Sequence, residues 1–402
     1  MKRGQLSFLT STHLVDDLYQ GAIPALLPFL MSERHYSYAA VSGLAFAASG
    51  ISSLFQPLFG LIADRSTRTW LVPTGFCSAA AGVSAAGLVH NYWLTWVLFA
   101  LAGIGIAAYH PPATSHARAA GGSSQTAMSV FAVGGTVGGA LAPPLVTLVV
   151  GDLGLAGSWL LAIPAVVWAV LWAVKGPWMR WRGHEAVQPL NAARNKQSGG
   201  AADDWRAFGR LVAVILGWSV PFVAVNSMVA LHAQRDLHQS KAVGAAVLTA
   251  YVAAQAIGML GGGWMGDRYG RMVTIRWGYL LSLPLLAGVA WSPSLPVLAV
   301  CAALFGAAMF LSFAAQVTLA QDYLPNRPGT ASGLALGMAI AAGGLCSPLL
   351  GWLADAHGLR SAFWALVAVF VVPTVLALTL QDRRLAAAEP QPAAAVAEGA
   401  AG

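Results

Sequence analysis

GLIADRSTR at residues 60–68 and GWMGDRYGR at residues 263–271 share one pattern, in which a glycine, an aspartate and two arginines keep the same spacing. The second copy begins 203 residues after the first, in a chain of 402 residues. A pair of glycines, a proline and a tryptophan within residues 138–159 also recur within residues 343–364. A repeat of about half the chain length indicates two similar halves in the same orientation.

The composition around these motifs is that of a membrane protein. The chain is 57% hydrophobic and only 9% charged, whereas a soluble domain has about 25% charged residues. A soluble protein of this size could not bury so much apolar surface. The apolar segments of about 20 residues match a hydrocarbon core ~30 Å thick, so we expect transmembrane helices.

Twelve apolar segments can be delimited, and they predict an all-α membrane protein with two pseudo-symmetric six-helix bundles. We expect the bundles at 1–174 and 207–380, a cytoplasmic linker at 175–206 and a disordered cytoplasmic tail at 381–402. With both ends in the cytoplasm, 18 of the 22 Lys and Arg residues fall on the cytoplasmic side, as the positive-inside rule requires. The predicted spans are 5–30, 39–63, 70–89, 92–114, 124–150, 157–174, 207–231, 243–265, 273–291, 295–319, 329–352 and 360–380.

Several other functions are excluded. The net charge of +7 comes from loops between apolar spans, a placement that serves membrane orientation and not nucleic-acid binding. Cys77, Cys301 and Cys346 stand apart in apolar surroundings, so we expect neither a disulfide nor a metal site. No nucleotide-binding or hydrolase motif occurs, and the linker is too short for a catalytic domain. We therefore expect no enzyme activity, no cofactor and no transport driven by ATP.

The first apolar segment carries the two acidic residues expected at membrane depth, Asp16 and Asp17. A carboxylate there costs about 2.5–3.5 kcal/mol on insertion scales and is rare without a function. His13 and Asp17 are spaced i, i+4 and share one helix face; Asp16 and Gln20 form a second pair, rotated by about 100°. Burial and a histidine partner act oppositely on proton binding, and their balance would allow proton exchange near neutral pH. A static hydrogen-bonded helix contact is the alternative.

The fifth span carries two interleaved GxxxG pairs, Gly134 with Gly138 and Gly135 with Gly139. Such glycines predict close approach of neighbouring helices. With Pro143 and Pro144 the run resembles, imperfectly, the glycine-proline motif of drug antiporters.

Three further stretches carry a resemblance to a known family: residues 13–20 with the two aspartates and a glutamine, LFQPLFG at 54–60 and YHPPA at 109–113. The doubled pattern resembles the signature loop of the major facilitator superfamily, and the first 145 residues resemble its fosmidomycin-resistance family. The resemblance implies the major facilitator fold and export of small toxic molecules in exchange for protons. That family usually has an amide at the position of Asp16 and the acid at Asp17, so Asp17 is the first candidate for coupling. Asp16 is left as an additional proton site or a contact for a cationic part of the substrate.

The resemblance also implies a gate at the repeated pattern. Asp64 would hold the cytoplasmic side closed by meeting the start of the eleventh span at residues 328–330, where a proline near the first position favours a helix start. Asp267 would meet the entry to the fifth span at residues 121–123 in the same way. Topological anchoring alone is the alternative. The candidate gating residues are Asp64, Arg65, Arg68, Asp267, Arg268 and Arg271.

Polar and aromatic residues inside the apolar spans are candidates for substrate binding. His110 precedes two prolines, where we expect the fourth span to break or bend and free backbone carbonyls for a cavity. In the second half, a helix–helix hydrogen bond is the alternative for each polar residue. We expect no Lys or Arg at mid-membrane, which disfavours phosphate esters and dicarboxylates as substrates. The candidate binding residues are Gln20, Tyr109, His110, Trp218, Asn226, Gln255 and Gln316, and the candidate proton-coupling residues are Asp17, Asp16 and His13.

These expectations combine into a proton-coupled secondary transporter that exports small drug-like or metabolite molecules. Its partners would be the substrate, protons and the lipid bilayer, and it would act as a monomer in the bacterial cytoplasmic (inner) membrane. The same fold and acids would serve a proton-coupled symporter importing a sugar, an organic acid or a siderophore-like compound. A membrane sensor without transport is a more remote alternative, because it would not need acids in the core of duplicated halves.

Overall fold

The computed structural model describes residues 2–36, 38–65, 70–175 and 202–383, in which every regular element is a helix. All twelve predicted spans are confirmed. Two of them consist of two segments: η1 (Leu155–Ala162) continues as an α-helix to Lys175, and α10 and α11 meet at Ser312. The other elements are α1 (Arg3–Arg34), α2 (Tyr38–Arg65), α3 (Leu71–Ala86), α4 (Tyr92–Gly121), α5 (Gln125–Leu153), α7 (Trp205–Arg235), α8 (Lys241–Tyr269), α9 (Arg271–Trp291), α10 (Leu295–Leu311), α11 (Phe313–Tyr323), α12 (Pro328–His357) and α13 (Leu359–Thr379).

Three predictions fall on residues outside this description. They are the linker, of which 176–201 is not described, the tail from 384 onward, and the gating role of Arg68.

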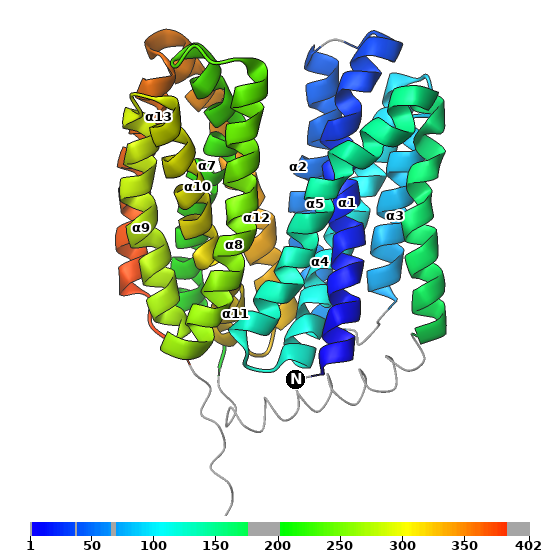
Figure 1. Cartoon of the computed structure of the whole chain (residues 1–402). Coiled ribbons are helices and arrows are strands. Elements are labelled where there is room, and N and C mark those ends of the chain that lie inside the picture. The colour runs from blue at the N-terminus through cyan, green and yellow to red at the C-terminus, as the bar shows by residue number, and fades with distance from the viewer. Residues whose placement is uncertain (1, 37, 66–69, 176–201, 384–402) are drawn as a thin grey trace, which may run out of the picture.

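The helices form two bundles that stand side by side (Figure 1). The first contains α1 to α5 and the span Leu155–Lys175, and the second contains α7 to α13. Each bundle has its own buried core: Tyr19, Phe76 and Phe99 lie in the first, and Tyr279 and Phe305 lie in the second. This arrangement is the predicted pair of six-helix bundles.

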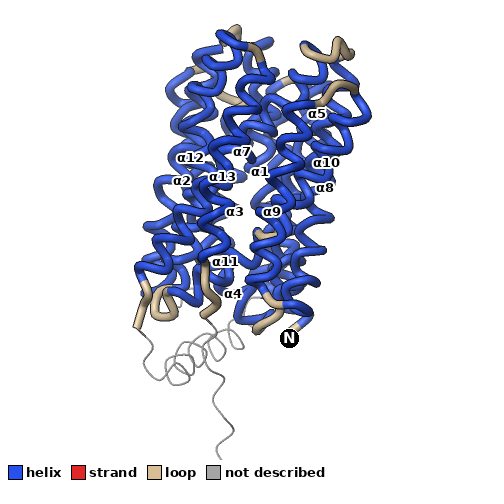
Figure 2. The backbone as a smooth tube through the Cα atoms, turned by 90° about the vertical axis from the view of Figure 1, so that its left-hand side faces the viewer, coloured by secondary structure: helices blue, strands red, loops and turns tan. Residues whose placement is uncertain are grey.

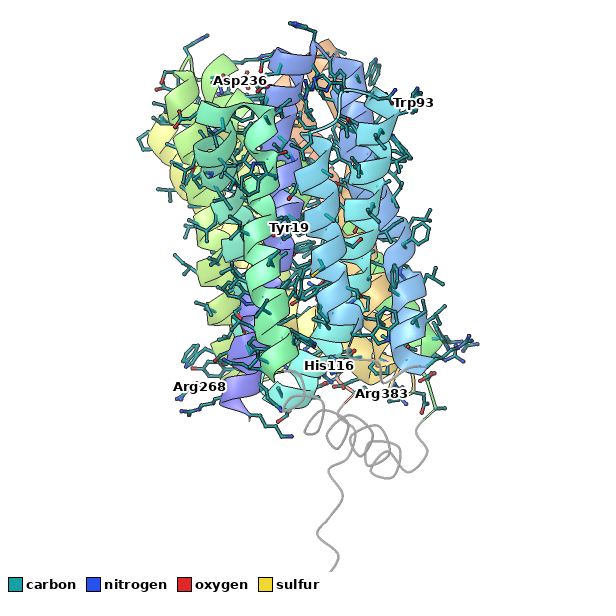
Figure 3. All side chains as sticks on the ribbon, turned by 90° about the vertical axis from the view of Figure 1, so that its right-hand side faces the viewer. Tyr19, Trp93, His116, Asp236, Arg268 and Arg383 are labelled. Carbon is teal, nitrogen blue, oxygen red and sulfur yellow. The ribbon has the colours of Figure 1, made fainter. Side chains whose placement is uncertain are left out.

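The outer surface of both bundles is apolar. Trp93 and Leu148 on the first bundle and Ile257 on the second expose about 70% of their surface, and Figure 3 shows side chains covering the outside of the helices. Among the described helices, ten are long and apolar enough to cross a membrane. The other two spans are α3, which is apolar but has 16 residues, and α1, which carries the polar stretch around Asp17. The chain is a multi-pass membrane protein.

The bundles meet mainly through two helix pairs, α2 with α12 and α5 with α8, and α4 with α12 and α5 with α11 make smaller contacts. Figure 1 shows the bundles converging at the end where α1 begins, which we call the basal end. Figure 2, turned by 90°, shows that the described regular elements are all helices. At the basal end a Cβ on Gly60 of α2 would overlap the carbonyl oxygen of Gly329 on α12. Only a residue without a side chain permits this approach, so the sequence pattern around Gly60 directly determines how closely the two bundles meet.

The expected break at Pro111 and Pro112 does not occur, because α4 continues through both prolines to Gly121. The hydroxyls of Thr114 and Ser115 donate to the carbonyl oxygens of His110 and Pro111, at 2.7 and 3.0 Å. Neighbouring helices and hydroxyl side chains allow prolines inside membrane helices. His110 therefore lies within the helix and not at its end.

A break occurs instead at Ser312, between α10 and α11. The Ser312 hydroxyl donates to the carbonyl oxygen of Met309 at 3.1 Å and accepts from Gln316 at 2.7 Å. Serine hydroxyls compete in this way with the helical hydrogen bonds of the backbone.

Candidate functional site

Asp17 stands between two imidazoles in the middle of the first bundle. His13 Nε2 lies 3.4 Å from Asp17 Oδ2, as the i, i+4 spacing on α1 predicts. His110 Nε2, from α4, lies 3.5 Å from Asp17 Oδ1. The carboxylate thus directs one oxygen to each histidine.

The orientation of His13 is determined by α5. Its Nδ1 lies 2.8 Å from the carbonyl oxygen of Phe131, and because a carbonyl only accepts, Nδ1 carries the hydrogen in this contact. Nε2 of the neutral ring then directs a lone pair toward the Asp17 carboxylate. Two acceptors 3.4 Å apart attract each other only when a proton is bound to one of them. A proton on either atom would allow the His13–Asp17 pair to form a hydrogen bond.

Asp16 is close to this pair but has a different environment. Its side chain is fully buried, Oδ2 lies 3.8 Å from His110 Nε2, and neither carboxylate oxygen has a hydrogen-bond partner among the described residues. Asp17, in contrast, lines a cavity while Asp16 does not. The role suggested for Asp16 as a contact for a cationic substrate group stays a prediction.

The cavity lies between the two bundles and has a volume of about 370 Å³. That volume is in the range of small-molecule binding pockets, about 300–1,000 Å³. The second bundle contributes four aromatic rings to the lining, those of Trp218, Phe222, Phe310 and Phe313. Most of the polar lining residues come from the first bundle: His13, Asp17, Gln20, Gln56, His110, Thr114 and Thr136, with Gln255 from the second.

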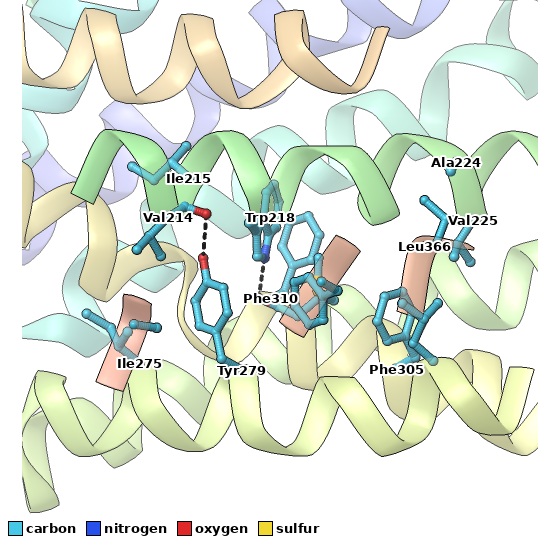
Figure 4. Close-up of a cluster of buried hydrophobic side chains, with 14 of the residues drawn as sticks. Val214, Ile215, Trp218, Ala224, Val225, Ile275, Tyr279, Phe305, Phe310 and Leu366 are labelled. Atoms are coloured by element: carbon cyan, nitrogen blue, oxygen red, sulfur yellow. Dashed lines mark hydrogen bonds between the residues drawn. The ribbon is translucent and has the colours of Figure 1, made fainter. Parts of the chain in front are cut away.

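The aromatic side of the cavity is a packed group of four rings on α7, α10 and α11. Trp218 stacks on Phe222 with ring centroids 5.0 Å apart, Phe222 meets Phe310 at 5.5 Å, and Phe310 stacks on Phe313 at 5.4 Å. The Trp218 Nε1–H donates to the carbonyl oxygen of Met309 at 3.0 Å, the bond drawn in Figure 4. The indole donor is thereby used within the protein, so the tryptophan offers the cavity only its π surface.

At the basal end each aspartate of the repeated pattern binds the start of a helix in the other bundle. Asp64 accepts hydrogen bonds from the Gly329 and Thr330 amides, at 2.6 and 2.8 Å, and from the Thr330 hydroxyl at 2.6 Å. Asp267 accepts from the Ser124 hydroxyl at 2.8 Å, the Thr126 amide at 3.0 Å and the Gln125 amide. Carboxylates are favoured at helix N-termini, where amides are free and the dipole is positive.

Comparison with known proteins shows the family. The family model described as Major Facilitator Superfamily matches residues 9–231 and 207–399. The chain belongs to the major facilitator superfamily. It is similar to the fosmidomycin resistance protein of Escherichia coli (strain K12), with 27% identity over 387 residues that cover 95% of this chain and 93% of that protein. It is similar to the uncharacterised transporter YfnC of Bacillus subtilis (strain 168), also of the major facilitator type, with 27% identity over 382 residues, 93% of this chain and 92% of that protein.

Solved structures of the superfamily have the same fold. The transporter FucP in an outward conformation superposes with a TM-score of 0.74 at 17% identity, over 94% of this chain and 98% of that one. The human organic anion transporter MFSD10 gives a TM-score of 0.70 at 15% identity, over 94% and 99%. A major facilitator protein is a secondary transporter and not an enzyme.

In this major facilitator protein, four of the predicted binding residues line the cavity: Gln20, His110, Trp218 and Gln255. The prediction also missed a residue, Gln56 of α2, which is nearly fully buried beside Pro57. Its signal was present, because Gln56 is a polar residue inside an otherwise apolar span.

Three predicted binding residues do not line the cavity in this conformation, and their role in substrate binding stays a prediction. Tyr109 is fully buried, and its hydroxyl lies 2.9 Å from that of Thr12, behind His13. Gln316 donates to the hydroxyls of Tyr279 and Ser312 inside the second bundle. Asn226 is exposed on α7 and is not among the residues that line the cavity.

The basal contacts correct one further expectation. Asp267 binds residues 124–126 and not 121–123, because Gly121 still belongs to α4 and α5 begins at Gln125. Arg271, a candidate gating residue, is buried and ion-paired with Asp322 and Asp382, and its gating role stays a prediction.

The other two described arginines of the pattern face outward. Arg65 is exposed at the end of α2, and the Arg268 guanidinium lies 5.6 Å from the ring centre of Tyr269.

The Asp17 cluster also has donor atoms that suit a metal ion. One ligand atom each from His13, Asp17 and His110 lie within 4.8 Å of one another. The two imidazoles face different oxygens of Asp17, at 3.4 and 3.5 Å.

Proposed function

We propose that this chain is a proton-coupled secondary transporter that exports small molecules by alternating access. The observation that carries the proposal is the Asp17 carboxylate, which stands between two imidazoles in the wall of a cavity shared by both bundles. A carboxylate in that position can exchange a proton with the cavity, and a substrate in the same cavity would sense its charge. Intramembrane acids of this kind serve ion pathways and coupling.

The basal contacts support alternating access. Asp64 and Asp267 connect opposite bundles through the helix starts they bind, so opening the basal end requires both sets of hydrogen bonds to break. The arginines of the repeated pattern lie at the basal end, and by the positive-inside rule they favour a cytoplasmic position for that end. We therefore interpret this conformation as one closed to the cytoplasm, in a bacterial cytoplasmic (inner) membrane with both termini inside.

Export is the direction favoured by the similarity to the fosmidomycin resistance protein. A single chain contains the whole cavity and the helix contacts between the two bundles. A monomer is therefore sufficient for the proposed transport cycle.

Transport should be driven by an imposed pH gradient. We expect purified protein in liposomes that contain a pH-sensitive dye to release internal protons when a substrate is added outside, because substrate and proton exchange at Asp17. The assay would use fosmidomycin, aromatic amines, organic acids and sugars, with protein-free liposomes as the control. Proton movement in the same direction as the substrate would favour the symporter, and transport insensitive to the gradient would contradict proton coupling.

Weakening the basal contacts should shift the protein toward a state open at the basal end. For Asp64→Asn and for Asp267→Asn we expect labelling of a single cysteine at buried Ser129 to accelerate roughly tenfold, because each variant loses charge-assisted hydrogen bonds. The measurement is maleimide labelling in a background without Cys77, Cys301 and Cys346. Asp355→Asn, at an exposed position of α12, is the matched control. Unchanged labelling in both variants would reject the gating role.

A further inference from the structure

The cavity has two chemically different sides, and together they specify a ligand. One side carries the Asp17 carboxylate with His13 and His110. The other carries the rings of Trp218 and Phe222, with Phe310 and Phe313 packed beside them. A ligand that fills about 370 Å³ must contact both sides at once.

The one carboxylate among the described lining residues, Asp17, has two imidazoles beside it but no permanent positive charge. Among the described lining residues there is no lysine or arginine. The titratable groups around Asp17 are Asp16 and His13 on its own helix and His110 on α4, while α5 presents Gly135 to it. Burying a carboxylate without a positive partner is costly. A cationic ligand at Asp17 would remove that cost, and an anionic one would increase it.

The aromatic side has the same charge preference. The face of an aromatic ring is the negative end of its quadrupole, so it attracts cations and apolar groups. Since the Trp218 N–H is already bonded to Met309, this side offers no hydrogen-bond donor from the indole to an anion. Both sides of the cavity therefore select against phosphonates and carboxylates.

We propose that the substrates are lipophilic organic cations, in which a protonated amine or an onium group is attached to aromatic rings. The cationic group binds at Asp17, and the rings lie against Trp218 and Phe222. This inference rests on the proposed function and extends it, because a cation that neutralises Asp17 competes with the proton for the same carboxylate. That competition enforces exchange: the carboxylate carries either the substrate or the proton through the membrane.

The test is a binding measurement on the full-length purified protein in detergent, without any gradient. We expect tetraphenylphosphonium, a permanent cation, to bind at pH 8 at least about tenfold more tightly than fosmidomycin. Its dissociation constant should rise as the pH is lowered, since protons and the cation compete for the Asp17 carboxylate. Asp17→Asn and Trp218→Ala should each weaken binding roughly tenfold, while Asp152→Asn, an exposed position at the end of α5, should not. Elution of each variant as a monodisperse peak checks that it is folded.

Tighter binding of fosmidomycin than of tetraphenylphosphonium would overturn the inference, and so would unchanged cation affinity in folded Asp17→Asn. The outcome is separable from the proposed function. Proton exchange driven by an anion would leave the transporter in place and reject the substrate class. Competitive cation binding without gradient-driven flux would retain the ligand class and reject proton coupling.

Discussion

Replacing Asp17 by asparagine should reduce proton-driven transport on the order of 100-fold or more, the scale of a lost proton-transfer group. Asparagine keeps the size of the side chain and one hydrogen-bonding oxygen, but it cannot bind or release a proton. His13 and His110 would both lose their acidic neighbour, since each imidazole faces one oxygen of Asp17. The measurement is the initial rate of substrate movement into liposomes under an imposed pH gradient.

The controls for this variant separate Asp17 from its neighbours. Asp152→Asn makes the same chemical change at an exposed position and should keep the full rate. Asp16→Asn tests the buried carboxylate behind the cavity wall, and a smaller loss is expected there. A normal rate in Asp17→Asn, or a complete loss only in Asp16→Asn, would show that coupling does not depend on Asp17.

Adding one methyl group to Gly135 should reduce transport about tenfold or more without unfolding the protein. A Cβ at Gly135 would overlap Asp17 Oδ2 and lie 2.7 Å from His13 Nε2. Because these atoms are the ends of side chains, the expected response is their displacement, while the packing of α5 on α1 is retained. A displacement of about 1 Å at a functional group can cost about 100-fold in activity. A smaller displacement of the two side chains is therefore sufficient for the expected loss of about tenfold or more.

Gly139→Ala is the matched control, because it adds the same methyl group one turn later on α5. There the nearest atom to a new Cβ is the Asp17 carbonyl oxygen at 3.9 Å, an ordinary contact. We expect Gly139→Ala to have a normal rate and both variants to have a normal melting temperature. Equal rates for the two variants would show that the space beside Gly135 is not needed for function.

The features that could be predicted from the sequence are those with a local cause. A span follows from about 20 consecutive apolar residues, and the i, i+4 spacing on one helix brings His13 to Asp17. The bond from Asp64 to the start of α12 was also predicted, through the resemblance carried by the repeated pattern. For Asp267, the predicted contact residues 121–123 lie three positions before the observed residues 124–126, because α4 continues to Gly121 and α5 begins at Gln125.

The sequence by itself therefore determined the membrane class, the twelve spans, the two halves and the pairing of His13 with Asp17. Only the tertiary structure decided which side chains face the cavity: it brought His110 to Asp17, placed Asp16 behind the wall, added Gln56 and turned Tyr109 away. The reason is rotational. Each residue turns a helix by about 100°, and in a membrane, where almost every face of a helix is apolar, the rotation is determined by contacts with other helices and not by hydrophobicity.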